Sequence, residues 1–371
     1  MPEIWLRYGT TDVVLDIKFE NLANQISAGF PLLPEDEINS AISRVPLTDN
    51  MLIIALSGTK ATGSAIARLA CRARERGFNF TIDVPNWSAG ALRASLGDSV
   101  TAPISRIDYR SLQDRMSKFQ STVIVSTVRY DPLFGFAGAP TALVRNLLPD
   151  SMSEAFAARK SNKPAPGVQG GPLKVATSAT AGILATSIEL VASSSGIAGI
   201  HIGKIDEAFG MAVSQLQSLS VIETDTVKCA IISASSESGV HSTLAGSLNS
   251  LWNNIQVLNE GGTAILLAEC RDGIGGGALQ MFVEDRLRQE QVQQISYVDG
   301  LEHLLFIEEL RREYGLGIVS TLPHYYARSK LGFSTYAGMK DIIDRLPEGQ
   351  GRNFKALVLS DADIVMLKPR V

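Results

Sequence analysis

Residues 261–277 of this chain, GGTAILLAECRDGIGGG, predict a buried strand followed by a loop of the kind that binds ligands. The five apolar residues Ala264–Ala268 stand between a glycine pair and the turn Glu269–Gly273, which is typical of a strand in a parallel sheet. An amphipathic helix is expected to begin near Ala278. Ligands bind at the carboxyl end of such strands because backbone N–H groups and the next helix N-terminus converge there. The glycine spacing matches neither a Rossmann fingerprint nor a P-loop.

The composition indicates a globular protein. Of the 371 residues, 45% are hydrophobic and 19% are charged, which is typical of a folded chain rather than a disordered one. The net charge of −4 and the lack of a basic block argue against nucleic-acid binding. The longest apolar runs, such as Ala264–Ala268 and Met51–Leu56, are far shorter than the roughly 18 residues of a membrane span. We therefore expect neither a nucleic acid nor a membrane as a partner.

The cysteines and the first residues bear on the compartment. Cys71, Cys229 and Cys270 are widely spaced and form no CxxC pair, which favours free thiols over disulfides or a zinc site. Residues 1–9 lack a charged-then-apolar signal pattern and begin an alternating strand. A soluble cytoplasmic protein is the expectation.

Strand and helix patterns alternate along most of the chain. Ile4–Tyr8 and Asp12–Ile17 predict an antiparallel hairpin. The further expected strands are Met51–Leu56, Phe78–Val84, Ser121–Ser126, Ile197–Ile202, Val227–Ser233, Thr263–Ala268, Gly317–Leu322 and Phe354–Leu359. The expected helices begin after Pro34 and cover Ala65–Arg76, Ala89–Leu96, Ile205–Leu219, Val240–Leu258, Ala278–Gln289, Leu301–Tyr314 and Thr335–Leu346. This rhythm predicts an α/β protein of two domains, residues 1–225 and 226–371, each with a mainly parallel sheet flanked by helices.

Several sequence marks occur in the order found in the nickel-pincer lactate racemase family, which this chain resembles over nearly its full length. They are Tyr8-Gly9 between two short strands, Pro132 with Gly135–Gly138 after a strand, the strand and helix start in Ile197–Met211, the stretch 261–276, and the terminal segment Ala356–Ala362. The resemblance implies a cleft between two α/β domains. It also implies a nickel ion in a lysine-tethered pyridinium-derived pincer, which takes a hydride from the α-carbon of a 2-hydroxy acid, with histidines as acid and base.

The family's functional residues are replaced at every position that can be compared. Lys60 stands for its substrate-binding arginine, and Asn86-Trp87 and Leu133 replace two histidines. The tethering lysine falls at Thr141 or a neighbour, with Arg145 the nearest basic side chain. Lys160–Lys163 lacks a later histidine, and Ser235–Ser238 with Leu244–Leu248 lacks a tyrosine, a glutamine and a lysine. A nickel centre without soft or imidazole donors is chemically implausible, so we expect no cofactor and no metal site. A nickel-pincer nucleotide remains the alternative.

Two histidines and a set of strand-end residues are the candidate site. His241 and His201 are the candidate catalytic bases, and His201 is also compatible with a satisfied core histidine. The candidate substrate-binding residues are Lys60, Trp87, Arg129, Ser235, Ser236 and Glu269. The serine-rich loops Ser57–Ser64, Ser126–Thr127 and Ser233–Ser238 suit an anion, with Lys60, Arg129 or Lys204 as counter-charge. The same serines are equally interpretable as helix N-caps, and Glu269 as a cap of its glycine-rich turn.

These features favour a lactate-racemase-like protein that has lost the nickel-pincer chemistry. It is expected to bind a small anionic metabolite, a 2-hydroxy acid or a phosphate-bearing one, in the interdomain cleft through Lys60, Arg129 and the loop 235–241. The alternative is an active 2-hydroxy-acid racemase or epimerase with a rearranged cofactor site, tethered at Lys160 or Lys163. A purely structural subunit is a third interpretation, and a homo-oligomer is compatible with all three.

Overall fold

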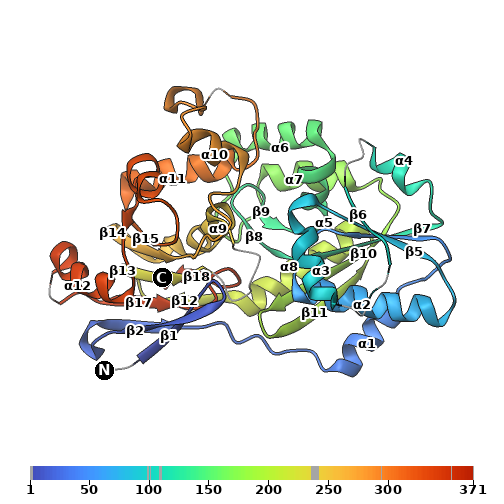
Figure 1. Ribbon diagram of the computed structural model, residues 1–371, viewed down its shortest axis with the longest axis horizontal. Coiled ribbons are helices and arrows are strands. Elements are labelled where there is room, and N and C mark those ends of the chain that lie inside the picture. The colour runs from blue at the N-terminus through green and yellow to red at the C-terminus, as the bar shows by residue number, and fades with distance from the viewer. Residues whose placement is uncertain are drawn as a thin grey trace. The chain divides into compact units, whose positions relative to one another are not determined.

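The computed structural model describes residues 3–97, 100, 102–107, 111–234, 242–293, 295–351 and 353–370, without the side chains of Trp87 and Gln350. The chain forms two compact units. Unit 1 consists of Met1–Gly29 and Ser220–Val371, and unit 2 consists of Phe30–Leu219 (Figure 1). Each unit contains a six-stranded, mainly parallel sheet with helices, which confirms the predicted α/β class.

The sheet of unit 2 has the strand order β11-β10-β7-β4-β5-β6. All neighbouring strands run parallel except for the antiparallel pair β10–β11. The strands are β4 (Met51–Ala55), β5 (Phe80–Val84), β6 (Ile104–Arg106), β7 (Ser121–Thr127), β10 (Thr186–Ser193) and β11 (Gly196–Gly203). The helices are α1 (Glu35–Ser43), α2 (Lys60–Glu75), α3 (Ala89–Leu96), α4 (Leu112–Met116), α5 (Ala139–Leu147), α6 (Pro149–Ser161), α7 (Gly171–Thr180) and α8 (Ile205–Ser220). A ribbon of β8 (Arg129–Asp131) and β9 (Gly135–Ala137) follows β7.

Successive strand residues point to opposite faces of this sheet, and helices cover both faces, so the side chains on both are buried. On one face, Ile53 belongs to a core cluster with Ile66 of α2 and Leu92 of α3. On the other face, Ile54 packs in a cluster with Leu143 of α5. The strands of this sheet therefore present polar side chains to a ligand at their two ends, where the loops begin.

The sheet of unit 1 is parallel throughout, with the order β16-β15-β14-β13-β17-β3. Its strands are β3 (Leu22–Ile26), β13 (Val227–Ser233), β14 (Leu258–Leu267), β15 (Gly315–Val319), β16 (Ser334–Thr335) and β17 (Ala356–Leu359). Its helices are α9 (Leu244–Asn254), α10 (Gly277–Val283), α11 (Leu301–Glu313) and α12 (Met339–Gln350). Two small sheets complete the unit, the hairpin β1 (Glu3–Tyr8) with β2 (Thr11–Asp16) and the pair β12 (Val221–Thr224) with β18 (Met366–Pro369).

The division of the chain differs from the one expected at residue 225. The first 29 residues belong to the same unit as the C-terminal part. β3 pairs with β17, and Ile4, Leu6 and Leu15 of the hairpin lie in the same core cluster as Val358. The pairing joins residues more than 300 positions apart, so no local sequence pattern could indicate it.

The stretch 261–277 folds as its sequence predicts. β14 ends at Leu267, and α10 begins at Gly277. Gly275 and Gly276 have positive φ angles of 63° and 64°, and a Cβ on Gly275 would lie 2.6 Å from the Thr243 side chain. The glycines are therefore needed for backbone conformation and for the close approach of this loop to the start of α9.

Among the described residues, the helices are too short or too polar to cross a membrane.

Candidate functional site

Four hydroxyl groups meet at the carboxyl edge of the unit 2 sheet. The Thr127 hydroxyl, at the end of β7, lies 3.1 Å from that of Thr59 and 3.2 Å from that of Thr62. It also lies 3.3 Å from the hydroxyl of Ser57, which follows β4. Ser57 and Thr62 are 2.6 Å apart. The structure thus brings together two of the serine- and threonine-rich loops identified in the sequence.

Part of this cluster caps a helix. Thr59 is the N-cap of α2, and its hydroxyl accepts a hydrogen bond of 3.1 Å from the backbone N–H of Thr62. α2 has 16 residues and carries no acidic residue in its first turn. Its positive dipole end is therefore not neutralised by its own sequence, and Lys60 adds an exposed cation there.

A second cation follows the cluster along the chain. Arg129 is half-buried in β8, two residues beyond Thr127. Lys204, the third predicted counter-charge, follows β11, which runs antiparallel and ends at the opposite edge of the sheet. Lys204 pairs there with Glu207 at 3.4 Å. Lys60 and Arg129, but not Lys204, therefore share the carboxyl edge with the hydroxyl cluster.

Glu189 is a buried carboxyl group on the other face of the same sheet. It accepts hydrogen bonds from the Ser126 hydroxyl and, at 2.8 Å, from the backbone N–H of Ala139 at the start of α5. Burial raises the pKa of Glu189 to about 7, against the lowering effect of these hydrogen bonds. Sequence reasoning missed this residue, because a single glutamate in an alanine- and serine-rich segment gives no signal of burial.

His201 lies on the face of Glu189, away from the hydroxyl cluster. It is opposite Glu189 in the β10–β11 register, and Glu189 is in register with Ser126. Ser126 and Thr127 are consecutive and point to opposite faces. The His201 ring Nε2 bonds Gln215 Oε1 at 2.7 Å, and Gln215 also donates to the carbonyl of Ala198 at 3.1 Å. His201 is therefore fixed by α8 and does not join Lys60 and Arg129.

Glu269 lies at the carboxyl edge of the unit 1 sheet. Its backbone carbonyl accepts hydrogen bonds from the N–H and the hydroxyl of Thr321, at 2.9 and 2.8 Å. Its carboxylate occupies the space above Gly9, because a Cβ built on Gly9 would lie 1.8 Å from Oε2. Burial, and then the charges of Cys270 and Glu269, raise the pKa of Tyr8 to about 12. Glu269 thus holds the hairpin turn and stays half-buried.

Arg7 and Asp361 form a second part of that edge, which the sequence did not reveal. The Ser233 hydroxyl, at the end of β13, donates to the carbonyl of Arg7 at 2.6 Å. Asp361, two residues after β17, has a positive φ of 54°. Burial and the neighbouring Asp363 raise its pKa to about 6, while Arg7 opposes the shift. Four chain segments distant in sequence, those of Arg7, Ser233, Glu269 and Asp361, therefore meet here.

The N-terminus of α9 is closed by backbone carbonyls. The N–H groups of Leu244 and Ala245 donate to Gly273 and Ile274, at 3.0 and 2.9 Å. The glycine-dense loop that follows β14, at the edge where a ligand was predicted, thus bonds the first turn of the neighbouring helix.

Several predicted site residues lie outside the described part of the chain. These are Ser235, Ser236 and His241, together with the side chain of Trp87. The described ends of the loop, Ala234 and Ser242, are both tied to the carboxyl edge, since Ala234 donates to Leu267 and Ser242 accepts from Asp272.

The positions that correspond to the family's cofactor residues are used for packing. Leu133 is completely buried, and Thr141 is 2% exposed and caps α5 through Gly138. Arg145 donates to Asp131 at 3.0 Å and lies over the Phe134 ring. None of these three side chains is a nickel donor or a lysine tether. Within the described residues, no group of three His, Cys, Asp or Glu side chains could hold a metal ion.

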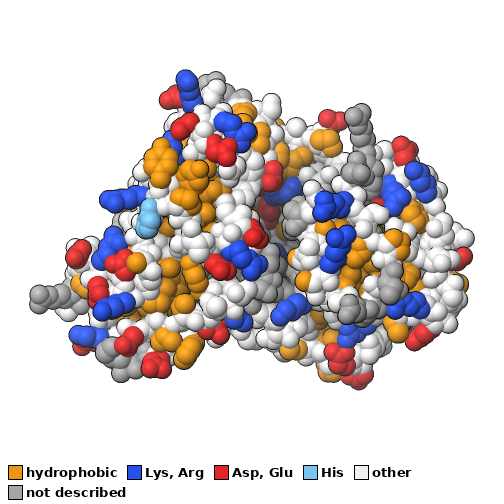
Figure 2. Space-filling view, in the orientation of Figure 1, with side chains coloured by type: hydrophobic (Ala, Val, Ile, Leu, Met, Phe, Trp, Pro, Cys, Tyr) orange, Lys and Arg blue, Asp and Glu red, His pale blue; other side chains and the backbone are white. Residues whose placement is uncertain are grey.

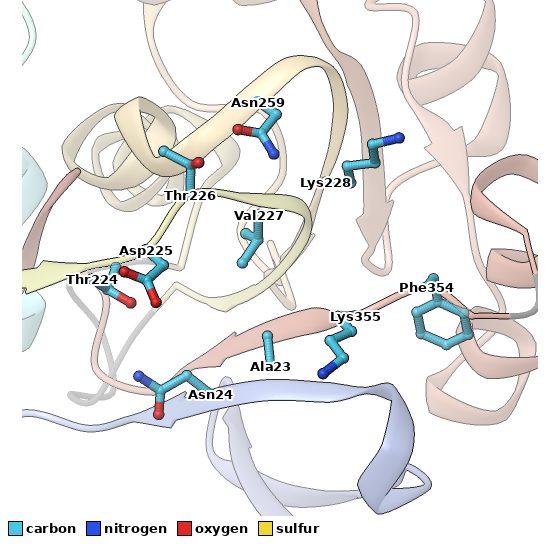
Figure 3. Close-up of a pocket in the computed structure, with 10 residues that line it drawn as sticks. All are labelled: Ala23, Asn24, Thr224, Asp225, Thr226, Val227, Lys228, Asn259, Phe354 and Lys355. Carbon is cyan, nitrogen blue, oxygen red and sulfur yellow. The ribbon is translucent and has the colours of Figure 1, made fainter. Parts of the chain in front are cut away.

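A polar pocket of about 400 Å³ lies at the opposite, amino edge of the unit 1 sheet (Figure 3). Its lining includes Lys228 at the start of β13 and Lys355 just before β17. The two ammonium groups point away from each other in Figure 3, so they do not converge on one anion. On the face visible in Figure 2, coloured Lys and Arg side chains are interspersed with Asp and Glu.

Comparison with solved structures identifies the fold. The chain is similar to the lactate racemase apoprotein from Thermoanaerobacterium thermosaccharolyticum, with a TM-score of 0.74 and 14% identity over 99% of this chain and 100% of that one. It is also similar to a protein from Thermotoga maritima, with a TM-score of 0.67 and 12% identity over 92% of this chain and 100% of that one. No protein-family model and no curated protein matches the sequence significantly. The chain therefore has a lactate-racemase-like fold.

Proposed function

We propose that this chain binds a small anionic metabolite, a 2-hydroxy acid or a phosphate-bearing compound, and does not carry out nickel-pincer hydride transfer. The binding site is the carboxyl edge of the unit 2 sheet. One observation carries this proposal: the hydroxyls of Ser57, Thr59, Thr62 and Thr127 meet at the N-terminus of a 16-residue helix. Helix N-termini and hydroxyl groups are suited to carboxylates and phosphates.

The two cations at this edge give the site its charge preference. Lys60 extends from the first turn of α2 and is exposed, and Arg129 is half-buried two residues after Thr127. Arg129 offers a planar fork that fits two carboxylate oxygens, whereas Lys60 acts as a point charge. A carboxylate would use both cations, and a neighbouring hydroxyl group of the ligand would reach the cluster at Ser57, its half-buried member, because Thr59, Thr62 and Thr127 are at most 6% exposed.

The absence of hydride chemistry is proposed from the side chains at the family's cofactor positions. Leu133 and Thr141 are buried in the packing of unit 2, and Arg145 is engaged by Asp131. Ordinary side chains cannot accept a hydride, so a chain without a cofactor would bind a 2-hydroxy acid but not racemise it by hydride transfer.

Binding is tested by isothermal titration with lactate, malate, glycerate and inorganic phosphate. We expect at least one of them to bind, and Lys60→Ala and Arg129→Ala each to weaken its affinity by about 10- to 100-fold, the loss of one charge-assisted hydrogen bond. Lys118→Ala is the matched control, because Lys118 is an exposed lysine before β7, at the opposite edge. Equal affinities for all three variants and the wild type would contradict the assignment of the site.

The absence of the cofactor is tested separately. The protein is co-expressed with the pincer-synthesis enzymes in nickel-supplemented cells, and its metal content and absorbance spectrum are measured. A colourless, metal-free protein agrees with the proposal. Stoichiometric nickel with a visible band would favour the alternative, an active racemase or epimerase with a rearranged site.

A further inference from the structure

A second cavity lies in unit 2, at the edge of the sheet opposite Lys60. It has a volume of about 610 Å³. It is bounded by α4, the first residues of β7, the end of α5 and the segment Gly182–Leu184 that leads into β10. Cavities of this size, within roughly 300–1,000 Å³, are typical of small-molecule sites.

The floor of the cavity is part of the hydrophobic core. Leu112 and Leu147, which are 6% and 7% exposed, belong to the core cluster on the α5 side of the sheet. Met116, Phe119 and Ile183 line the cavity and pack against the same cluster. Leu184, which also lines the cavity, is 90% exposed, so its side chain is available to contact an apolar ligand.

The polar groups of the cavity are neutral. Every described lining residue is uncharged, and the polar ones carry hydroxyl or amide groups. The Thr122 side chain points to the same side of the sheet as Ile124, where the cavity lies, and Ser117 donates to the carbonyl of Asp114 at 2.9 Å. Each of these oxygens retains the capacity to accept one more hydrogen bond.

The guanidinium group beside the cavity is already paired. Arg115 lies 4.9 Å from the centre of the Phe119 ring. It donates two hydrogen bonds of 2.8 Å to the carboxylate of Asp83, which is 1% exposed. Its charge is therefore balanced inside the protein, and a charged ligand would find no counter-ion in the described lining.

We propose that this cavity binds an uncharged amphiphile, an aliphatic or aromatic molecule with one hydroxyl group, independently of the anion at the carboxyl edge. The apolar part of the ligand lies on the core side chains and under Leu184. Its hydroxyl group bonds the neutral oxygens along the start of β7.

The test uses 1-butanol, 1-hexanol and 1-octanol as probes, with octanoate as the charged counterpart of 1-octanol. Binding is measured by isothermal titration at neutral pH. We expect one site per chain, with affinity rising about fourfold for each added methylene. Octanoate binds at least tenfold more weakly than 1-octanol, because its carboxylate must be desolvated without a partner.

Two glycine substitutions localise the binding. Gly182 lines the cavity and a Cβ there meets no atom within 4 Å, so Gly182→Trp is designed to cover the mouth of the cavity with its indole ring. Gly90→Trp is the matched control on α3, where a Cβ also meets nothing within 4 Å. We expect Gly182→Trp to weaken 1-octanol binding at least tenfold and Gly90→Trp to leave it unchanged.

Circular dichroism and the melting temperature establish that both variants fold. Ile183→Asp provides a second variant, which places a charge in the apolar lining and is expected to abolish binding. The proposal is overturned if no alkanol binds at millimolar concentration, if octanoate binds as tightly as 1-octanol, or if folded Gly182→Trp binds like the wild type.

Discussion

At the residue scale, the buried carboxyl group of Glu189 makes stability depend on pH. Its pKa of about 7 in the folded protein exceeds its ordinary value of 4.5, mainly because of burial. Between these pH values the folded state holds more protons than the unfolded state, so the free energy of unfolding falls as pH rises. Above about pH 7 Glu189 is ionised in the folded protein as well, and the free energy of unfolding falls no further on its account.

Glu189→Gln removes this dependence while keeping a group that can accept from the Ala139 N–H. Relative to the wild type, its free energy of unfolding should rise between pH 5 and pH 8 by roughly 3 kcal/mol at most, from 1.36 kcal/mol per pKa unit. The measurement is urea unfolding of both proteins across this range. Because Asp361 titrates with the same sign, the difference between variant and wild type is the relevant quantity. A difference that does not change with pH would contradict the role of Glu189.

A second prediction concerns Gly9, where backbone conformation and space both require glycine. Gly9 has a φ of 60°, and a Cβ there would overlap the Glu269 carboxylate. Gly9→Ala should lower the free energy of unfolding by about 2–4 kcal/mol, as strain and overpacking combine. Gly261→Ala is the control, because Gly261 has a φ of 71° with nothing within 4 Å, and it should cost only about 1 kcal/mol.

The contact with Glu269 is tested by a double variant. Gly9→Ala with Glu269→Ala should recover most of the overpacking part of the loss, since only the Cβ at 2.9 Å remains, and keep the backbone part. Additive losses in denaturant unfolding would show that the two residues do not interact.

At the scale of the element, the start of α2 combines a cap with the proposed anion site. Thr59→Ala removes the acceptor for the Thr62 N–H and should lower the free energy of unfolding by about 1 kcal/mol. It should also weaken binding of the anion identified by titration, since one cluster hydroxyl is lost. Thr59→Ser keeps the cap hydroxyl and should retain both properties. If Thr59→Ala is destabilised but binds the anion with unchanged affinity, the cluster serves only as a structural cap of α2.

Elements with a clear local pattern could be predicted from the sequence. The apolar run Ala264–Ala268 lies within β14 but for its last residue, and the hairpin strands and α8 begin within one residue of their expected positions. β10 was missed because Thr186–Ser193 lies in an alanine- and serine-rich segment without clear turn signals. β3 was missed because its partner β17 lies more than 300 residues away.

The candidate site, like the fold, could be predicted only where a local sequence pattern exists. Lys60 and Arg129 each follow a predicted parallel strand, so the rule that ligands bind at the carboxyl ends of such strands assigns both to one edge. The predicted boundary at residue 225 places Glu269 in the other domain, as the structure does, but the rule gives no means of finding Glu189 or the Arg7–Asp361 approach. Those depend on which distant strands pair, and pairing is decided by the whole core rather than by local periodicity.

At the scale of the whole molecule, the fold is shared with a protein of very different sequence. A lactate racemase apoprotein matches 99% of this chain at 14% identity, so the backbone arrangement persists while most side chains differ. The positions implied to hold the cofactor carry side chains that pack or cap, such as Leu133 and Thr141. Conserved architecture is thus compatible with a different use of the strand ends, because function depends on the site and not on the fold.

The last prediction concerns the two compact units. Unit 2 is a continuous segment with its own sheet and core, so a fragment of residues 30–219 should unfold in a single cooperative transition. A fragment of residues 226–371 should not, because it lacks Ile4, Leu6 and Leu15, each at most 1% exposed in the core of unit 1. Losing three such side chains removes roughly 5–9 kcal/mol of burial, as much as the stability of many domains.

Joining residues 1–29 to 220–371 through a flexible Gly/Ser linker should restore folding, measured by circular dichroism and urea unfolding. Cooperative unfolding of the 226–371 fragment alone would show that the N-terminal strands are dispensable for this core.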